Sequence, residues 1–277
     1  MDEEPVPLPS APSRAVGLGV TLQPPLSRRG HGPGLLLVIP KEYDDAKAKN
    51  ETLDPDPLQK WAEEGYAVAQ VVFDENEFSA AGKRALDALV QLEECDVKDQ
   101  ICLICESSIQ SSFSPFLLVI DCLYIFTVYG PADKHGEIMN VLHMETPMKI
   151  VATVAYEDVV MPETHATLYQ LAGSQQTSNP AAHSDAHSRY HYPEAKSAGF
   201  MIPGHADYRH SSANVAHTRA LTFLKKRLDG PYFDLEKIWE EHTEYEFAVR
   251  SVARTMGTMV QEPYVNHVPT VSRHCRP

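Results

Sequence analysis

A repeat of histidines marks the second half of the chain, where His183, His187 and His191 recur every four residues, with Asp185 between the first two. On an α-helix this spacing would place the three imidazoles on one face, an arrangement that suits a metal ion. Prolines close to both ends of the segment leave room for only a short helix. We therefore expect no metal site here, and a metal protein is the least favoured interpretation.

A second pair of side chains with metal or redox chemistry is Cys102 and Cys105, which form a C-x-x-C pattern in an apolar run. On a strand, an odd offset sends the two thiols to opposite faces, so they would not share a metal ion. A redox dithiol also needs partial exposure, whereas this run is predicted to be buried. We interpret both residues as core cysteines. The odd total of five cysteines is typical of free thiols in a reducing compartment, and we expect a cytoplasmic protein.

The charge of the chain narrows the range of partners. The 277 residues have a formal net charge of −14, and the basic run at 225–227 is short. This balance argues against nucleic acid and against an anionic membrane surface. The N-terminus lacks the charged start and apolar run of a signal peptide. The longest apolar stretch, residues 113–129, contains Asp121 and is short for a membrane span. No glycine-rich phosphate loop is present, so we expect no nucleotide and no other cofactor.

The hydrophobic pattern predicts an α/β protein. Apolar runs without alternation are typical of strands covered on both faces, hence of a parallel sheet. Such runs cover residues 35–39, 66–73, 101–105, 124–129 and 148–154, and the apolar run at 117–120 is expected to lead as a loop or helix into the strand at 124–129. Helices are predicted over residues 58–64, 78–92, 164–172 and 215–228. The alternation indicates a mainly parallel sheet with helices on both faces.

Both ends of the chain differ from this central part, which we assign to residues 34–230. Residues 1–33 are rich in proline and are expected to form a poorly ordered arm. In residues 231–277, apolar residues at alternating steps of three and four predict one long amphipathic helix with a narrow seam. The seam comprises Leu235, Ile238, His242, Tyr245, Val249, Val252, Met256 and Met259. Such a stripe is seldom left in water. We therefore expect this helix to form a homodimer or to aggregate, in preference to packing on the central part of the chain or staying loose.

The order of segments between Met148 and Leu228 adds a family resemblance. A strand, an acid-bearing loop (155–162), a helix, a long His-rich loop (190–210) and a last helix follow one another. This order resembles the C-terminal third of an α/β-hydrolase, and more closely the dienelactone hydrolase (carboxymethylenebutenolidase) family. The resemblance covers about residues 28–230. Residues 239–269 also resemble the opening of a SnoaL-like (NTF2-like) domain, of which only the start would be present.

The resemblance implies a catalytic triad, in which a histidine takes the proton of a nucleophile and an acid orients that histidine. Aligning residues 101–110 with the family's strand-to-helix turn puts Ser107 at the nucleophile position. Cys105 and Ile109 then stand where the family has the two glycines that let the turn form. Asp158, after a strand and four residues before a proline, is at the position of the triad acid.

The histidine position departs from the family. Counting back from the last helix puts Ala198 where the family has its catalytic histidine. His205 lies seven residues further on in the same loop and is the candidate base, with His191 as a second candidate.

Two functions follow from the resemblance. The first is a hydrolase acting on a lactone or ester of a small aromatic-derived or secondary metabolite, with Ser107, Asp158 and His205 as its catalytic residues. The alternative is a catalytically degenerate relative that serves as a small-molecule binding or accessory protein. A redox or metal protein built on the cysteines and histidines is a third, less favoured hypothesis.

Overall fold

The computed structural model describes residues 11–39, 54–74, 77–98, 101–106, 123–131, 166–173, 187–260, 265–267 and 272–274. Eight strands form the central sheet: β1 (Arg14–Gly17), β2 (Val20–Gln23), β3 (Gly34–Ile39), β4 (Ala67–Val72), β5 (Ile101–Glu106), β6 (Leu123–Pro131), β7 (Ala166–Ala172) and β8 (His187–Tyr192). In the described part of the chain the sheet is accompanied by the helices α2 (Pro57–Glu63), α3 (Phe78–Gln91) and α6 (His210–Leu228) and by the 3-10 turn η2 (Ala198–Met201).

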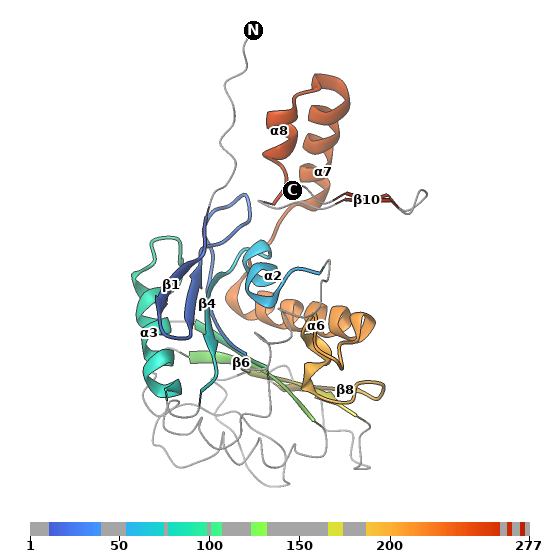
Figure 1. Ribbon diagram of the computed structural model, residues 1–277. Coiled ribbons are helices and arrows are strands. Elements are labelled where there is room, and N and C mark those ends of the chain that lie inside the picture. Colours follow the sequence, from blue (N-terminus) through green and yellow to red (C-terminus); the bar gives the residue numbers. More distant parts are fainter. Residues whose placement is uncertain are drawn as a thin grey trace.

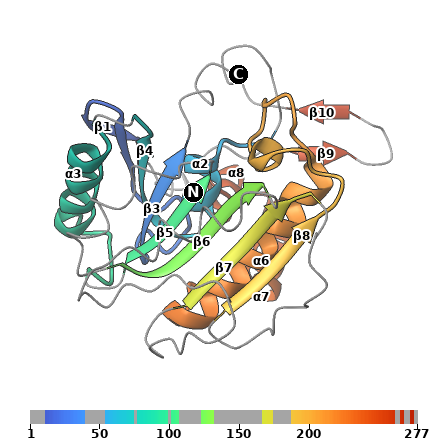
Figure 2. The ribbon, with the colours of Figure 1, turned by 90° about the horizontal axis from the view of Figure 1, so that it is seen from below.

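The strands lie in the order β1-β2-β4-β3-β5-β6-β7-β8 (Figures 1 and 2). β2 pairs antiparallel with β1 and β4, and all pairings from β4 through β8 are parallel. This order, with its single reversed strand near one edge, is that of an α/β-hydrolase sheet. The predicted fold class, a mainly parallel sheet with helices on both faces, is therefore confirmed.

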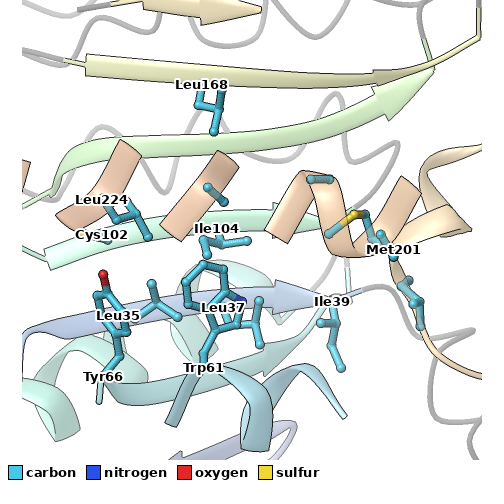
Figure 3. Packing of buried hydrophobic residues seen from close by; sticks show 14 of the residues in the cluster. Leu35, Leu37, Ile39, Trp61, Tyr66, Cys102, Ile104, Leu168, Met201 and Leu224 are labelled. Atoms are coloured by element: carbon cyan, nitrogen blue, oxygen red, sulfur yellow. The ribbon is translucent and has the colours of Figure 1, made fainter. Parts of the chain in front are cut away.

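The two faces of the sheet carry separate cores because successive residues of a strand point to opposite sides. On one face Leu35, Leu37 and Ile39 of β3 pack with α2 and α6, including Trp61 and Leu224 (Figure 3). On the other face the intervening residues of β3 pack against α3. Every residue of β3 is buried, which is what its uninterrupted apolar run predicts for a strand covered on both sides.

Local sequence signals set the ends of the helices. The Asp56 side chain caps α2 by accepting a hydrogen bond from the backbone N–H of Gln59 at 2.9 Å, and Pro57 opens the first turn. The last turn of α6 carries the basic run Lys225, Lys226 and Arg227, where the helix dipole favours cations. The predicted strands that became β3, β4, β5 and β6 and the predicted helices that became α2, α3 and α6 are confirmed.

Two predictions about the elements of the sheet were wrong. Residues 164–172 were expected to form a helix, but Ala166–Ala172 is β7, which bonds to β6 on one side and to β8 on the other. Two complete rows of hydrogen bonds outweigh a weak local helix signal. Part of the N-terminal arm is also ordered, since β1 and β2 extend the sheet. The expected strand at 148–154 lies outside the described residues, as does the apolar run at 117–120, which was expected to lead as a loop or helix into the strand that became β6.

The C-terminal region is a helical hairpin, whereas one long helix was predicted. It consists of α7 (Leu235–Thr243), the π-helical turn η3 (Glu244–Val249) and α8 (Val252–Met256). Arg250 has a φ of 56° and ends η3 in the left-handed conformation, so the chain reverses before α8. A short antiparallel pair follows, β9 (Val265–His267) and β10 (Ser272–His274). Figure 1 shows this hairpin standing clear of the sheet.

Because the chain reverses, residues from the two ends of the predicted seam region lie next to each other. The His242 Nδ1 atom lies 2.6 Å from the buried Thr258 hydroxyl, and Ile238 and Tyr245 are half-buried. The seam is therefore partly covered within one chain, and dimerisation through it stays a prediction. Among the helices of the described part of the chain, none is long and apolar enough to cross a membrane.

Candidate functional site

The carboxyl ends of the parallel strands form the edge at which ligands bind in open α/β sheets. β5, β6 and β7 end there at Glu106, Pro131 and Ala172, as Figure 2 shows for the direction of these strands. The 3-10 turn η2, which follows β8, lies beside all three strands. The loop of residues 193–209 that contains η2 is therefore the described part of the candidate site.

Two of the three predicted catalytic residues cannot be placed against this loop. Ser107 directly follows the last residue of β5, and it lies outside the described residues. Asp158 also lies outside them. Of the predicted triad, only His205 is described, so the roles of Ser107 and Asp158 stay predictions.

The loop after β8 is tied together by its own polar groups. The Ser197 hydroxyl donates to the Asp207 carboxylate at 2.7 Å and accepts from the backbone N–H of Gly199 at 3.3 Å, which caps η2. The ring of Phe200 is fully buried and packs at a tilt against Tyr192 at the end of β8. These contacts fix the path of the loop across the edge of the sheet.

His205 lies against the turn where the family's histidine is expected. A Cβ atom on Gly199 would overlap the His205 imidazole, so this ring packs directly on the backbone next to Ala198. The candidate base His205 therefore lies next to Ala198, the position that the sequence resemblance assigns to a catalytic histidine. What it can do there depends on its hydrogen bonds.

The hydrogen bond of His205 opposes a role as the triad base. Its Nδ1 atom accepts the backbone N–H of Asp207 at 3.0 Å. A neutral ring in this state carries its proton on Nε2 and has no further lone pair to take a proton from a serine. A triad histidine needs the opposite arrangement, in which Nδ1–H donates to an acid and Nε2 accepts. In this conformation His205 is a loop-fixing residue.

A carboxylate that the sequence analysis did not assign to the site also holds this loop. Asp54 accepts a hydrogen bond from the Tyr208 hydroxyl at 2.8 Å, and the His210 Nδ1 atom lies 3.2 Å from the same oxygen. Asp54 precedes α2, so it connects the loop after β8 to the segment that follows β3. No local sequence pattern indicates this role, because the partners are 154 and 156 residues away along the chain.

A buried polar chain connects β7, β8 and α6 behind the site. The Gln170 amide donates to the Ala216 carbonyl at 2.7 Å, and the Tyr192 hydroxyl donates to the Gln170 side-chain oxygen. Arg219 in turn donates to the Tyr192 oxygen at 3.0 Å and stacks on the Tyr190 ring at 4.0 Å. Burial raises the pKa of Tyr192, although the hydrogen bond from Arg219 opposes this. The hydroxyl therefore stays protonated and available as a donor.

A second buried polar cluster joins α2 to α6 away from this edge. The His217 Nε2 atom lies 3.4 Å from a Glu64 oxygen, Lys225 lies 3.6 Å from the other, and the Trp61 ring packs on His217 at 4.6 Å. Burial lowers the pKa of His217. Burial alone would raise the pKa of Glu64, but the hydrogen bond with His217 and the positive charge of Lys225 leave it lowered. We infer a neutral imidazole beside an ionised carboxylate.

The histidine and cysteine patterns of the sequence fall partly in strands of the sheet. His187 and His191 belong to β8, so the helical metal face considered for them does not form. Cys102 is fully buried in β5, and burial raises its pKa, which confirms a core cysteine there. Burial raises the pKa of the Cys95 thiol to about 11. In the described part of the chain no group of three or more potential ligands is close enough to hold a metal ion.

Comparison with known proteins gives a likeness of fold. No protein-family model matches the chain, and no curated protein matches it. A protein described as a dienelactone hydrolase from Klebsiella pneumoniae subsp. pneumoniae MGH 78578 has 14% sequence identity and a TM-score of 0.42, over 74% of this chain and 91% of that one. A structure designated m3DLH has 14% identity and a TM-score of 0.44, over 75% and 91%. The acylaminoacyl peptidase of Pyrococcus horikoshii has 13% identity and a TM-score of 0.38, over 79% and 41%. This likeness assigns no activity to the chain.

Proposed function

We propose that this chain is a catalytically degenerate relative of the dienelactone-type hydrolases, which binds a small molecule at the carboxyl edge of its sheet without hydrolysing it. The observation that carries the proposal is the hydrogen bond from the Asp207 backbone N–H to His205 Nδ1. Because Ala198 stands at the family's histidine position, His205 is the base on which hydrolysis through the loop after β8 would depend.

The same loop supports a binding role. Ser197 and Asp207 fix its path, and Asp54 ties it to the segment before α2. A loop held on both sides at the carboxyl edge is a rigid wall for a ligand, which reduces the entropy lost on binding. A small lactone or aromatic ester, or the acid formed from it, is the ligand class that the resemblance suggests.

The decisive experiment compares hydrolysis of an activated aryl ester and of a small aromatic lactone by the wild type, Ser107→Ala and His205→Ala. We expect the two variants to keep the slow background rate of the wild type, since neither side chain would take part in a reaction. Ser211→Ala, which removes an exposed serine at the start of α6, is the matched control. A loss of several orders of magnitude in Ser107→Ala, with folding intact, would restore the hydrolase interpretation.

Binding is measured separately by thermal unfolding in the presence of the intact lactone and of its hydrolysed acid. A ligand that binds only the folded state raises the melting temperature in proportion to the logarithm of its concentration. We expect such a rise with at least one of the two compounds. If neither compound stabilises the protein and no hydrolysis is seen, this edge is not a small-molecule site.

A further inference from the structure

The C-terminal hairpin exposes large apolar side chains on each of its helical segments. Leu235 is 73% exposed, Trp239 66%, Phe247 68% and Val252 71%. Leu235 and Trp239 are one helical turn apart and share a face of α7, next to the face that packs on α8. An apolar stripe with an aromatic residue at its centre is typical of a surface that binds another protein segment.

Acidic residues border this stripe on one side. Glu236 and Glu240 each follow one of the two apolar residues, so they form the next ridge of the same helix, and Glu244 continues it in η3. All three carboxylates are exposed, and no ion pair with another residue of the described segments is observed for them. Glu241 is engaged elsewhere, since it accepts a hydrogen bond from Arg28 of the main domain at 2.8 Å.

The charges decide between the partners that such a stripe would accept. A second copy would bring the same acidic ridge against itself, and the whole chain has a net charge of −14. An anionic lipid surface would be repelled for the same reason. A basic segment with an apolar face, by contrast, would cover Leu235 and Trp239 while its cations reach the carboxylates.

We propose that the outer face of α7 and η3 is a docking surface for an amphipathic basic segment of another protein. Leu235, Trp239 and Phe247 supply the apolar contacts, and Glu236, Glu240 and Glu244 select for lysine or arginine. This surface is distinct from the carboxyl edge of the sheet, so the proposal stands or falls independently of the proposed function.

The two tryptophans of the chain make binding observable. Trp61 is 3% exposed in the core, so acrylamide quenches chiefly Trp239. A short tryptophan-free amphipathic peptide of leucine and lysine is titrated into the full-length protein, and a peptide of leucine and glutamate with the same pattern is the comparison. We expect the basic peptide to shift the emission to the blue and to protect Trp239 from quenching, and the acidic peptide to do neither. Affinity should fall as salt is added.

Variants separate this surface from general charge attraction. Glu236→Lys with Glu240→Lys should weaken binding of the labelled basic peptide about tenfold or more, because two contacts change from attraction to repulsion. The control pair Asp87→Lys and Glu93→Lys changes the net charge equally at exposed sites in and just after α3, and should leave the affinity nearly unchanged. Leu235→Ser should weaken binding without a change in charge.

Several outcomes would overturn the proposal. Equal losses in the test pair and the control pair would mean that the peptide is attracted only by the acidic protein as a whole. If the basic and acidic peptides bound equally well, or if neither bound, the carboxylates of this surface would not select for a basic partner. Sedimentation that shows a dimer at micromolar concentration, converted to monomer by Trp239→Ser, would assign the stripe to a second copy of the chain.

Discussion

Two buried tyrosines show how the surroundings of one hydroxyl group determine what it contributes to stability. The Tyr192 hydroxyl lies in the chain from Arg219 to Gln170, whereas the Tyr66 hydroxyl has no hydrogen-bond partner among the described residues. A buried polar group without a partner has lost its hydration and gained nothing in return. The same substitution should therefore have opposite consequences at the two sites.

We expect Tyr192→Phe to lower the free energy of unfolding by about 1–3 kcal/mol, because it leaves Gln170 and Arg219 without their shared partner. Tyr66→Phe should leave stability unchanged or raise it by up to about 1 kcal/mol. Urea unfolding of both variants against the wild type measures the difference. A loss at Tyr66 as large as that at Tyr192 would show that a bound water or an undescribed residue satisfies the Tyr66 hydroxyl.

His217 should make stability depend on pH. Its ordinary pKa is 6.5, and burial lowers that pKa in the folded state. Below pH 6.5 the unfolded chain therefore binds more protons at this site than the folded one, so the free energy of unfolding falls as the pH drops. The full contribution is present above pH 6.5, and the loss levels off below the folded pKa.

Replacing His217 with phenylalanine removes this titration and keeps a ring against Trp61. The difference in free energy of unfolding between pH values of about 7.5 and about 5.5 should be smaller in His217→Phe than in the wild type. Denaturant unfolding at both pH values measures it. An undiminished difference would mean that other groups, and not His217, account for acid sensitivity in this range.

At the scale of elements, the turn η2 depends on a glycine because of what packs on it. A methyl group at Gly199 would overlap the His205 imidazole, so Gly199→Ala should cost about 1–3 kcal/mol of stability. The ring is the side chain that must move, so the cost should largely vanish in a His205→Ala background. A double-mutant cycle by thermal unfolding tests this coupling. If the effects of Gly199→Ala and His205→Ala were additive, the cost of the alanine would come from the backbone and not from its contact with the imidazole.

The elements also show where sequence patterns succeed. β3 and β5 are uninterrupted apolar runs, and α3 has one apolar stripe, so local pattern and final position agree. β7 carries Gln170 at its centre, and its hydrogen bonds to β6 and β8 come from segments far away in the sequence. The spacing of apolar residues over 235–259 correctly predicted helices with an apolar face. It could not reveal that the chain reverses at Arg250. Its resemblance to the start of a SnoaL-like domain stays a prediction.

At the scale of the whole molecule, stability should reside in the two cores on either side of the sheet. Leu37 of β3 is completely buried against the helices α2 and α6, whereas Val90 on α3 is 40% exposed. Leu37→Ala should cost about 2–5 kcal/mol, since it removes buried methyl groups and leaves a cavity. Val90→Ala, the surface control, should stay within about 0.5 kcal/mol of the wild type. Similar losses for both would contradict the assignment of the core.

The sequence by itself determined the fold class, because burial on both faces leaves a continuous apolar run in each central strand of a parallel sheet. It also located the loop that contains His205 and the helix that became α2, since these depend on residues nearby in the chain. Only the tertiary structure decided that His205 packs on Gly199 and accepts the Asp207 N–H, and that Asp54 reaches Tyr208. A histidine's role depends on which nitrogen carries its proton, and partners brought together by folding determine that.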